Sequence, residues 1–356
     1  MKGVILHGGS GTRLRPITHT EVKQLLPVAG KPVSEYALED MIEIGIREIN
    51  IIVGSVGADA VTGYYGDGSK WGVSITYTHQ PKPLGIAHAV GLTEDFVAGD
   101  TFVVYLGDNL LNGGIGKLSD AFGEGRFDAL VALCRVNRPQ SYGVAELEEG
   151  RIVRLVEKPK QPKSNLALVG VYFFRPDIFD VIRTLKPSAR GELEITEAIQ
   201  KLIEEGRNVG YQEIKGWWKD TGTTEEILDA NRLVLDEIER QIDGKVASET
   251  GIIGRVRVMS GASVDAQSVI KGPCHIGSGT EITHSVIGPN TSIGNNCRIS
   301  GVEIEDSIIM DGCIIEGNRE MRLYESIIGT SCKISKNSGI KRASKMIVGR
   351  DSDIAV

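Results

Sequence analysis

The pattern of apolar and polar residues differs between the first and the last part of the chain. Over residues 1 to about 240, short apolar runs rich in strand-forming residues are separated by segments with helical periodicity. The predicted strands are VILH, INIIVG, VSITYTH and FVVYLG, and residues 34–46 are predicted as a helix. Strands separated by helices imply a mainly parallel sheet with helices on both faces, and ligands bind beyond the carboxyl ends of such strands.

The last helical pattern of this half is TTEEILDANRLVLDEIERQI, residues 223–242. Thr223 and Glu226 have the spacing of a capping box, which predicts the start of the helix. The apolar residues that follow repeat on one helical face as far as Ile242, so we expect the helix to end at Asp243 and Gly244. The apolar stripe consists of Ile227, Ala230, Val234, Ile238 and Ile242.

From about residue 250 the pattern changes, and aliphatic residues recur every six positions between Gly, Asn, Ser and Asp. This period is neither helical nor that of a hairpin, and it predicts a parallel β-helix whose aliphatic residues point inward. The change of pattern predicts two domains, residues 1–243 and residues 244–356. The period slips by one residue after Ile282 and is interrupted after Ile299, Ile315 and Ile334. The repeating positions are Val258, Val264, Ile270, Ile276, Ile282, Ile287, Ile293, Ile299, Ile309, Ile315, Ile328, Ile334, Val348 and Ile354.

Composition narrows the class of protein. The chain has 356 residues, of which 41% are hydrophobic and 24% charged, as in soluble globular proteins. A net charge of -7 argues against a general nucleic-acid binder. The chain has neither an apolar run of membrane-spanning length nor a signal-peptide pattern, so we expect a cytoplasmic protein without a membrane partner. The five cysteines form no CxxC pair and the histidines no HExxH motif, which favours reduced thiols and argues against zinc.

The glycine-rich segment GVILHGGSGTRLRP, residues 3–16, is the strongest chemical signal. A P-loop would need GxxxxGK[ST], which is absent, and a dinucleotide turn would need glycine where Leu14 stands. The remaining interpretation is a triphosphate loop, in which glycine N–H groups surround phosphate oxygens and Arg13 and Lys23 add positive charge. A tight strand-to-helix turn with two exposed bases is the alternative.

Further motifs follow in order along the chain: KQLLPVAGKP, QPKPLGIAHAV, YLGDN, SYGVAEL, EKPKQPKSN, ARGELEIT and WWKDTGT. With GGSGTRLRP and the six-residue repeat, they resemble the glucose-1-phosphate thymidylyltransferases in their long form, a branch of the sugar-1-phosphate nucleotidyltransferases. The resemblance implies a Rossmann-like α/β domain followed by a left-handed β-helix of hexapeptide repeats. It also implies condensation of dTTP with glucose 1-phosphate, by attack of the sugar phosphate on the α-phosphate with release of pyrophosphate.

The resemblance also implies roles for individual residues. Arg13, Lys23, Asp108 and Lys158 are the expected catalytic residues. A glutamine amide and a glycine in the base pocket suit a pyrimidine. The expected nucleotide-binding residues are Gly8, Gly9, Gly11, Thr12, Arg13, Gln80 and Gly85, and the expected sugar-phosphate-binding residues are Tyr142, Gly143, Glu157, Lys158, Val169 and Arg190.

Two polyanions must meet in this reaction, and the attacking phosphate is already ionised at pH 7. Catalysis therefore requires positioning and charge neutralisation more than a base. Asp108 follows a predicted strand and Asp220 precedes the capped helix, and by resemblance both hold Mg²⁺. His7 has no role as a base in this chemistry, and we expect it to be a wall or a polar contact beside the nucleotide.

Three alternatives stay open from the sequence. The nucleotide could be UTP, with glucose 1-phosphate or N-acetylglucosamine 1-phosphate as the sugar. The β-helix, which contains His275 and His284, could add an acetyltransferase activity, although assembly into a homo-oligomer is the role we expect for it. The chain could also be a non-catalytic regulatory homologue, but Arg13, Lys23 and both aspartates are present.

Overall fold

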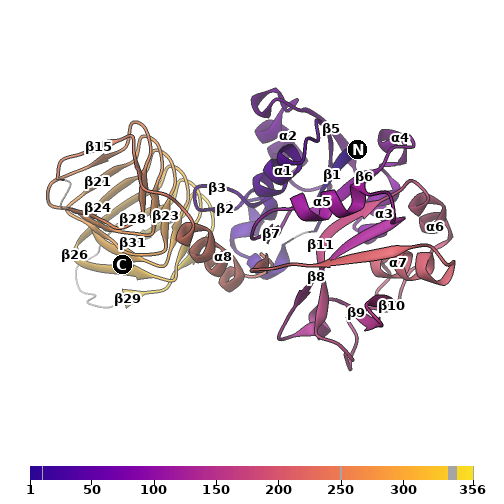
Figure 1. Ribbon diagram of the computed structural model, residues 1–356. Coiled ribbons are helices and arrows are strands. Elements are labelled where there is room, and N and C mark those ends of the chain that lie inside the picture. Colours follow the sequence, from indigo (N-terminus) through magenta and orange to yellow (C-terminus); the bar gives the residue numbers. More distant parts are fainter. Residues whose placement is uncertain (10, 249–250, 336–342, 356) are drawn as a thin grey trace. The chain divides into compact units, whose positions relative to one another are not determined.

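The computed structural model describes residues 1–9, 11–248, 251–335 and 343–355 (Figure 1). The chain forms two compact units. Met1–Gly9 and Ser34–Asp220 make the first unit, and Ser10–Val33 and Thr221–Val356 make the second. This grouping differs from a boundary after residue 243, because residues 10–33 and 221–243 pack with the C-terminal strands. Within the described ranges, the chain has no helix with the length and apolarity needed to cross a membrane.

The first unit is built on a nine-stranded sheet in the order β10-β9-β11-β6-β1-β4-β5, with β8 beside β11 and β12 beside β8. The strands are parallel along β6-β1-β4-β5 and between β12 and β8, and antiparallel around β11. All four strands predicted from the sequence are confirmed as β1, β4, β5 and β6. The strands are β1 (Lys2–His7), β4 (Glu48–Val53), β5 (Ser74–His79), β6 (Phe102–Leu106), β8 (Ala129–Arg135), β9 (Gly143–Glu148), β10 (Arg151–Glu157), β11 (Leu166–Phe174) and β12 (Val209–Glu213).

Helices pack on both faces of this sheet. Val4 and Leu6 face one core, which α3, α6 and α7 cover. On the other face Gly3 lies against Met41 of α1, so close that a Cβ on Gly3 would come within 2.6 Å of the sulfur. The predicted helix over residues 34–46 is confirmed, although α1 ends earlier because Gly45 turns the chain with a φ of 86°. The helices are α1 (Val33–Glu43), α2 (Ala58–Tyr65), α3 (Ile86–Gly91), α4 (Glu94–Val97), α5 (Gly116–Gly123), α6 (Ile178–Thr184) and α7 (Ile195–Glu204).

The second unit is dominated by stacked parallel strands (Figure 1). Val258 pairs with Ile276, which pairs in turn with Ile293, and the same relation continues to Ile309 and Ile328. The aliphatic residues of the six-residue repeat all contribute to one core, as the periodicity predicted. One ladder contains β14 (Gln241–Ile242), β17 (Val256–Val258), β20 (Cys274–Ile276), β23 (Thr291–Ile293), β25 (Ile308–Ile309), β27 (Ile327–Ile328) and β30 (Ile347–Val348).

The remaining strands of the stack form a second, eleven-stranded sheet. Its strands are β15 (Lys245–Val246), β16 (Ile252–Ile253), β18 (Ser263–Val264), β19 (Val269–Lys271), β21 (Glu281–Thr283), β22 (Val286–Ile287), β24 (Arg298–Glu305), β26 (Ile314–Tyr324), β28 (Lys333–Ser335), β29 (Ala343–Ser344) and β31 (Asp353–Ala355).

Helix α8 (Thr224–Asp236) precedes the stack. Its predicted cap is confirmed, because the Thr223 side chain accepts a hydrogen bond from the Glu226 backbone N–H at 3.2 Å. The predicted end at residues 243 and 244 is wrong. The helix ends at Asp236, and Ile242 instead lies in β14, where it pairs with Val258 in the first ladder of the stack. The apolar stripe continued past the helix because Ile242 belongs to the core of the stack, which follows a different period.

Candidate active site

Strand pairing brings the two predicted metal ligands together in the first unit. Asp108 comes directly before β7 (Asn109–Leu111), and Asp220 is the last residue of β13 (Trp218–Asp220). These short strands are antiparallel, with Asn109 opposite Asp220. Both aspartates line a cavity of about 150 Å³. The arrangement places two carboxylates at one end of the sheet, where a ligand of an α/β protein is expected.

Asn109 is a site residue that the sequence reasoning missed. Its side-chain Nδ2 donates to Asp108 Oδ1 at 2.7 Å, and its Oδ1 accepts from Trp218 Nε1 at 2.6 Å and from the Gly170 backbone N–H at 3.3 Å. The residue is 2% exposed, so its orientation is set by these partners. Asn109 therefore fixes the Asp108 carboxylate, in the way that outer hydrogen bonds orient metal ligands. Its place beside Asp108 in YLGDN was the available signal.

The donor set at this position suits Mg²⁺. Within the described ranges, no three His, Cys, Asp or Glu side chains come together as a metal-binding group. Zinc and calcium sites made by protein alone need more ligands than two carboxylates provide. Mg²⁺ binds through one or two carboxylates together with substrate phosphates and water. Asp108 and Asp220 fit that requirement, since they share a cavity and Asp108 is held by Asn109.

Asp108 also lines a second cavity, of about 240 Å³. Gly8, Gly9, Gln80 and Gly85 all line it as well. Gly9 has a φ of 98°, and a Cβ there would meet nothing within 4 Å. The backbone at Gly9 is therefore open to a ligand, which agrees with a residue placed to meet a nucleotide.

Gln80 lies buried at the wall of this cavity. Its Nε2 is 3.0 Å from His88 Nδ1 and donates to the Gly85 carbonyl at 3.3 Å. Its Oε1 lies on the side of Gly8, 3.5 Å from the position of a Cβ on that glycine. The amide nitrogen is thus held by the protein, and the oxygen is the atom placed toward the glycines. An acceptor at this position suits the N3–H of a pyrimidine.

Packing within the protein gives a further reason for glycine at position 85. A Cβ at Gly85 would lie 2.4 Å from the Leu193 carbonyl oxygen, and the residue has a φ of 104°. The absent side chain therefore makes room for the backbone that precedes α7 as well as for a ring in the cavity. The Leu193 carbonyl also accepts from the Ala87 N–H, which holds the start of α3 against this segment.

Charged residues expected at the sugar phosphate gather around Glu157. Glu157 and Lys158 line the 150 Å³ cavity, and Arg190 is not among its lining residues. Arg190 Nη1 lies 3.3 Å from Glu157 Oε1, and Lys158 Nζ lies 3.6 Å from the same oxygen. Thr196 Oγ1 donates to Glu157 Oε2 at 3.1 Å. A Cβ on Gly143 would clash with Thr196 at 2.4 Å, so glycine is needed there for the strand to approach the carboxylate.

Two other predicted residues of this group have different surroundings. Tyr142 lines the cavity, and its ring meets Trp218 edge-on with centroids 5.0 Å apart, as expected of a wall. The Val169 side chain is fully buried, while Leu168 and Gly170 on either side of it line the cavity. Any contact from Val169 to a sugar must therefore come from its backbone.

The remaining predicted residues, Gly11, Thr12, Arg13 and Lys23, lie in the second unit. Gly11 has a φ of 58°, and a Cβ there would be 2.9 Å from Thr18 and 3.4 Å from Lys23. Thr18 Oγ1 also donates to the Gly11 carbonyl at 2.7 Å. Lys23 is 9% exposed, so its charge is held in a restricted position. The structure thus brings the predicted residues together in two groups, one in each unit.

His7 is a core residue. It is 4% exposed, and its ring packs edge-on against Tyr65 with centroids 5.8 Å apart. Burial lowers the pKa of His7 to about 3, against a smaller opposing effect of the Asp108 charge. The ring is therefore neutral near pH 7. Its neighbours Leu6 and Gly8 line the 240 Å³ cavity, whereas His7 is not among the lining residues.

Comparison with known proteins identifies the class of protein. Residues 2–237 match the family model for nucleotidyl transferases, and residues 270–355 match the model for the GMPPB C-terminal domain. Together with the fold and the cavities around Asp108, the first match defines an enzyme of the nucleotidyltransferase class. The more specific assignment comes from full-length relatives.

The chain is 48% identical over 358 residues to glucose-1-phosphate thymidylyltransferase of Streptomyces antibioticus, covering 100% of this chain and 99% of that protein. It is 45% identical to the low-salt glycan biosynthesis nucleotidyltransferase Agl11 of Haloferax volcanii, covering 99% of each. A candidate glucose-1-phosphate thymidylyltransferase structure from Bacillus anthracis, in complex with a sucrose, superposes with a TM-score of 0.63 at 42% identity, covering 68% of this chain and 97% of that one. The chain belongs to the glucose-1-phosphate thymidylyltransferase family.

Proposed function

We propose that this protein condenses dTTP with glucose 1-phosphate to give dTDP-glucose and pyrophosphate, with Mg²⁺ as the cofactor. The observation that carries the proposal is the position of Asp108. It lines both the cavity of Gly8, Gly9 and Gln80 and the cavity of Glu157 and Lys158. A nucleotide base in the first cavity and a sugar phosphate in the second would bring the reacting phosphates to the aspartate between them.

In the proposed reaction, a phosphate oxygen of glucose 1-phosphate forms a bond to the α-phosphorus of dTTP. The bond from that phosphorus to the oxygen bridging to the β-phosphate breaks, and pyrophosphate leaves with the electron pair. No proton has to move, because the nucleophile is an ionised phosphate. The protein therefore contributes orientation and compensating charge.

Individual residues of the chain orient the substrates or compensate their charge. Gln80 Oε1 accepts from the base, and Glu157 accepts from a sugar hydroxyl. Lys158 and Arg190 hold the sugar phosphate, and the resemblance assigns Arg13 and Lys23 to the triphosphate. Asp108 and Asp220 would hold Mg²⁺, which when bound neutralises charge on the phosphate oxygens.

We also propose that the stacked strands form a left-handed β-helix of hexapeptide repeats through which copies of the chain associate. The aliphatic residues of the repeat, which are buried in or packed against one core, support the first part. The second part is supported by β30, which stands last in its ladder and, among the residues that the structure describes, pairs with β27 alone. An open end of a parallel stack presents unpaired backbone groups that a partner can cover. Sedimentation velocity would test this association, and a protein that sediments only as a monomer would contradict it.

The test of the activity is a matrix of nucleoside triphosphates against sugar 1-phosphates, followed by pyrophosphate release with Mg²⁺. We expect dTTP with glucose 1-phosphate to have the highest kcat/KM. Reaction only of UTP with N-acetylglucosamine 1-phosphate would replace the proposal with a uridylyltransferase. No pyrophosphate release from any pair would identify a regulatory homologue. Acetyl transfer from acetyl-CoA to a sugar phosphate would add the second activity.

A further inference from the structure

A single buried side chain joins three segments of the second unit. Asn231, on α8, is fully buried. Its Oδ1 accepts from the Ala29 backbone N–H at 2.9 Å and from Ser292 Oγ at 2.7 Å. Its Nδ2 donates to the Asn290 carbonyl at 2.9 Å. The asparagine thus ties the segment after Lys23 to the stacked strands at residues 290–292.

Ala29 belongs to a hairpin made by β2 (Pro27–Val28) and β3 (Lys31–Pro32). Its turn has two residues with positive φ, Ala29 at 49° and Gly30 at 90°. The ring of His275, in β20 of the stack, lies so close to Gly30 that a Cβ there would be 2.2 Å from its Nε2. The hairpin tip is therefore in contact with both α8 and the stack.

The segment before this hairpin contacts other parts of the second unit at two further points. A Cβ on Gly222, just before the cap of α8, would lie 2.6 Å from Arg13 Nη2. A Cβ on Gly349, in the last part of the stack, would lie 3.3 Å from the Pro16 carbonyl oxygen. We call residues 11–33, which include Arg13 and Lys23, the triphosphate loop. It contacts the start of α8 and the stacked strands at Arg13, at Pro16 and at the hairpin tip.

We infer that Asn231 is a positioning residue for the nucleotide, and that the β-strand stack preorganises the triphosphate loop through it. This inference rests on the proposed function, which assigns Arg13 and Lys23 to the triphosphate. A loop of short 3-10 turns and positive-φ residues has little structure of its own, so fixing it before binding lowers the entropy lost when the nucleotide binds. Coupling is reciprocal, and dTTP binding must therefore stabilise the contacts of Asn231.

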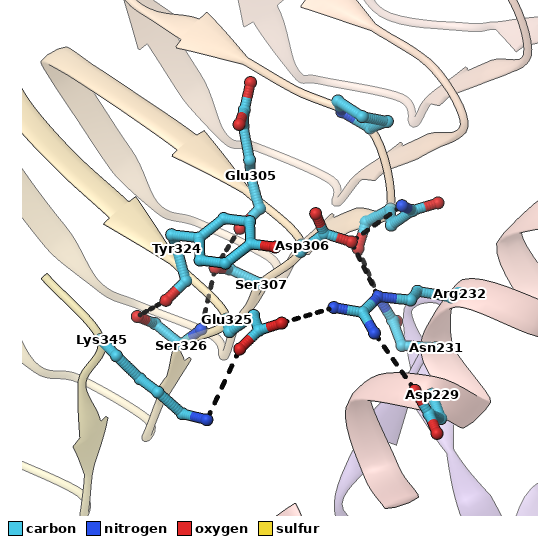
Figure 2. Close-up of polar contacts among 12 residues, drawn as sticks. Asp229, Asn231, Arg232, Glu305, Asp306, Ser307, Tyr324, Glu325, Ser326 and Lys345 are labelled. Carbon is cyan, nitrogen blue, oxygen red and sulfur yellow. Dashed lines mark hydrogen bonds and ion pairs between the residues drawn. The ribbon is translucent and has the colours of Figure 1, made fainter. Parts of the chain in front are cut away.

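The neighbouring residue provides a matched control. Arg232 also ties α8 to the stack, through Asp306 at 2.7 Å and Glu325 at 3.3 Å (Figure 2). It also donates to Asp229, one turn earlier on the same helix, at 3.1 Å. These partners lie on α8 and the stack, whereas Asn231 also holds the hairpin. Loss of Arg232 removes support between helix and strands and leaves the Asn231–Ala29 hydrogen bond in place.

The experiment compares Asn231→Ala with Arg232→Ala in the full-length chain by steady-state pyrophosphate release. For Asn231→Ala we expect the KM for dTTP to rise about tenfold, the scale of losing one buried hydrogen bond. The KM for glucose 1-phosphate should stay within a factor of two of wild type. For Arg232→Ala both KM values should stay within a factor of two, although the melting temperature falls. Equal kinetics in the two variants would overturn the inference.

A second measurement uses the unaltered protein, in case Asn231→Ala fails to fold. Hydrogen exchange of the wild type should slow at residues 27–32 and 289–293 when dTTP is added at saturation with Mg²⁺. Unchanged exchange at both segments under saturating dTTP would overturn the inference. Absence of dTDP-glucose synthesis by the wild type would instead reject the proposed function, so the two failures are distinguishable.

Discussion

The two groups of predicted site residues are positioned by different means. The acidic pair, Asp108 and Asp220, is placed by backbone pairing of β7 with β13 and by the hydrogen bonds of Asn109. Among the described residues, the basic loop that carries Arg13 and Lys23 consists of three short 3-10 helices and a small hairpin. Side chains from α8 and the stack support it instead. The basic loop lies near the start of the sequence, but its position depends on α8 and on the stacked strands, which come after the first unit in the sequence.

Removing a carboxylate from the acidic pair should have the largest effect. In Asp108→Asn we expect kcat/KM for pyrophosphate release to fall about a thousandfold, because charge neutralisation of the phosphates contributes several kcal/mol. Asp100→Asn, in the same unit and more than half exposed, is the control and should match wild type. Activity of Asp108→Asn near the wild-type value would remove the acidic pair from the mechanism.

In the basic loop, Arg13→Ala should raise the activation free energy of nucleotidyl transfer by about 3 kcal/mol, as for loss of one preorganised donor. The rate should therefore fall roughly a hundredfold. Single-turnover kinetics with dTTP would measure the change. Arg298→Ala removes an exposed arginine of the second unit and should leave the rate unchanged. A rate for Arg13→Ala within a factor of two of wild type would show that this arginine does not stabilise departing pyrophosphate.

Loss of Asn109 would show how far the acidic pair depends on its hydrogen-bonded support. In Asn109→Ala we expect the affinity for Mn²⁺, used as a Mg²⁺ substitute and followed by electron paramagnetic resonance, to fall about tenfold. Trp218→Phe removes one of the three hydrogen bonds and keeps an aromatic ring beside Tyr142, so its effect should be smaller. Metal affinity equal to wild type in both variants would contradict the role given to Asn109.

Each unit contains one buried histidine. Because the folded protein resists protonation of these side chains, acid pH should lower the stability of the fold. Burial lowers the pKa of His7 to about 3, and burial together with the Arg257 charge lowers the pKa of His275 to about 4. As the pH falls below about 6.5, the unfolded chain binds protons that the folded chain does not, so stability decreases. His275→Asn should flatten the loss of unfolding free energy between pH 6.5 and 4, measured by urea denaturation. If the unfolding free energy of His275→Asn changed with pH as steeply as that of wild type, the role given to His275 would be contradicted.

Regular patterns made much of the fold predictable. Short apolar runs rich in strand-forming residues identified β1, β4, β5 and β6, the Thr223 cap marked the start of α8, and the six-residue period identified the core of the stack. The acidic pair was also found, because each aspartate stands beside a recognisable motif. The patterns failed where structure is short or irregular. Strands β7 and β13 have three residues each, too few for a period, so the contacts of Asn109 were not foreseen.

The support of the basic loop was beyond prediction for a different reason. Ala29 and Asn231 are separated by 202 positions, and no local preference of either residue indicates the other. Gly30 and Gly85 were visible as glycines, but their close neighbours, His275 and the Leu193 backbone, come from distant parts of the chain. Contacts of this kind follow from the assembled fold and not from the properties of the segment itself.

The division of the second unit between Ser10–Val33 and Thr221–Val356 bears on how such genes can recombine. A single crossover near residue 243 would pair the hairpin and Asn231 of one parent with the Ser292 and His275 of another. A crossover near residue 221 would instead separate Ala29 from Asn231. Productive exchange of the C-terminal half between diverged relatives would have to transfer residues 10–33 as well, so we expect the two segments to be inherited together.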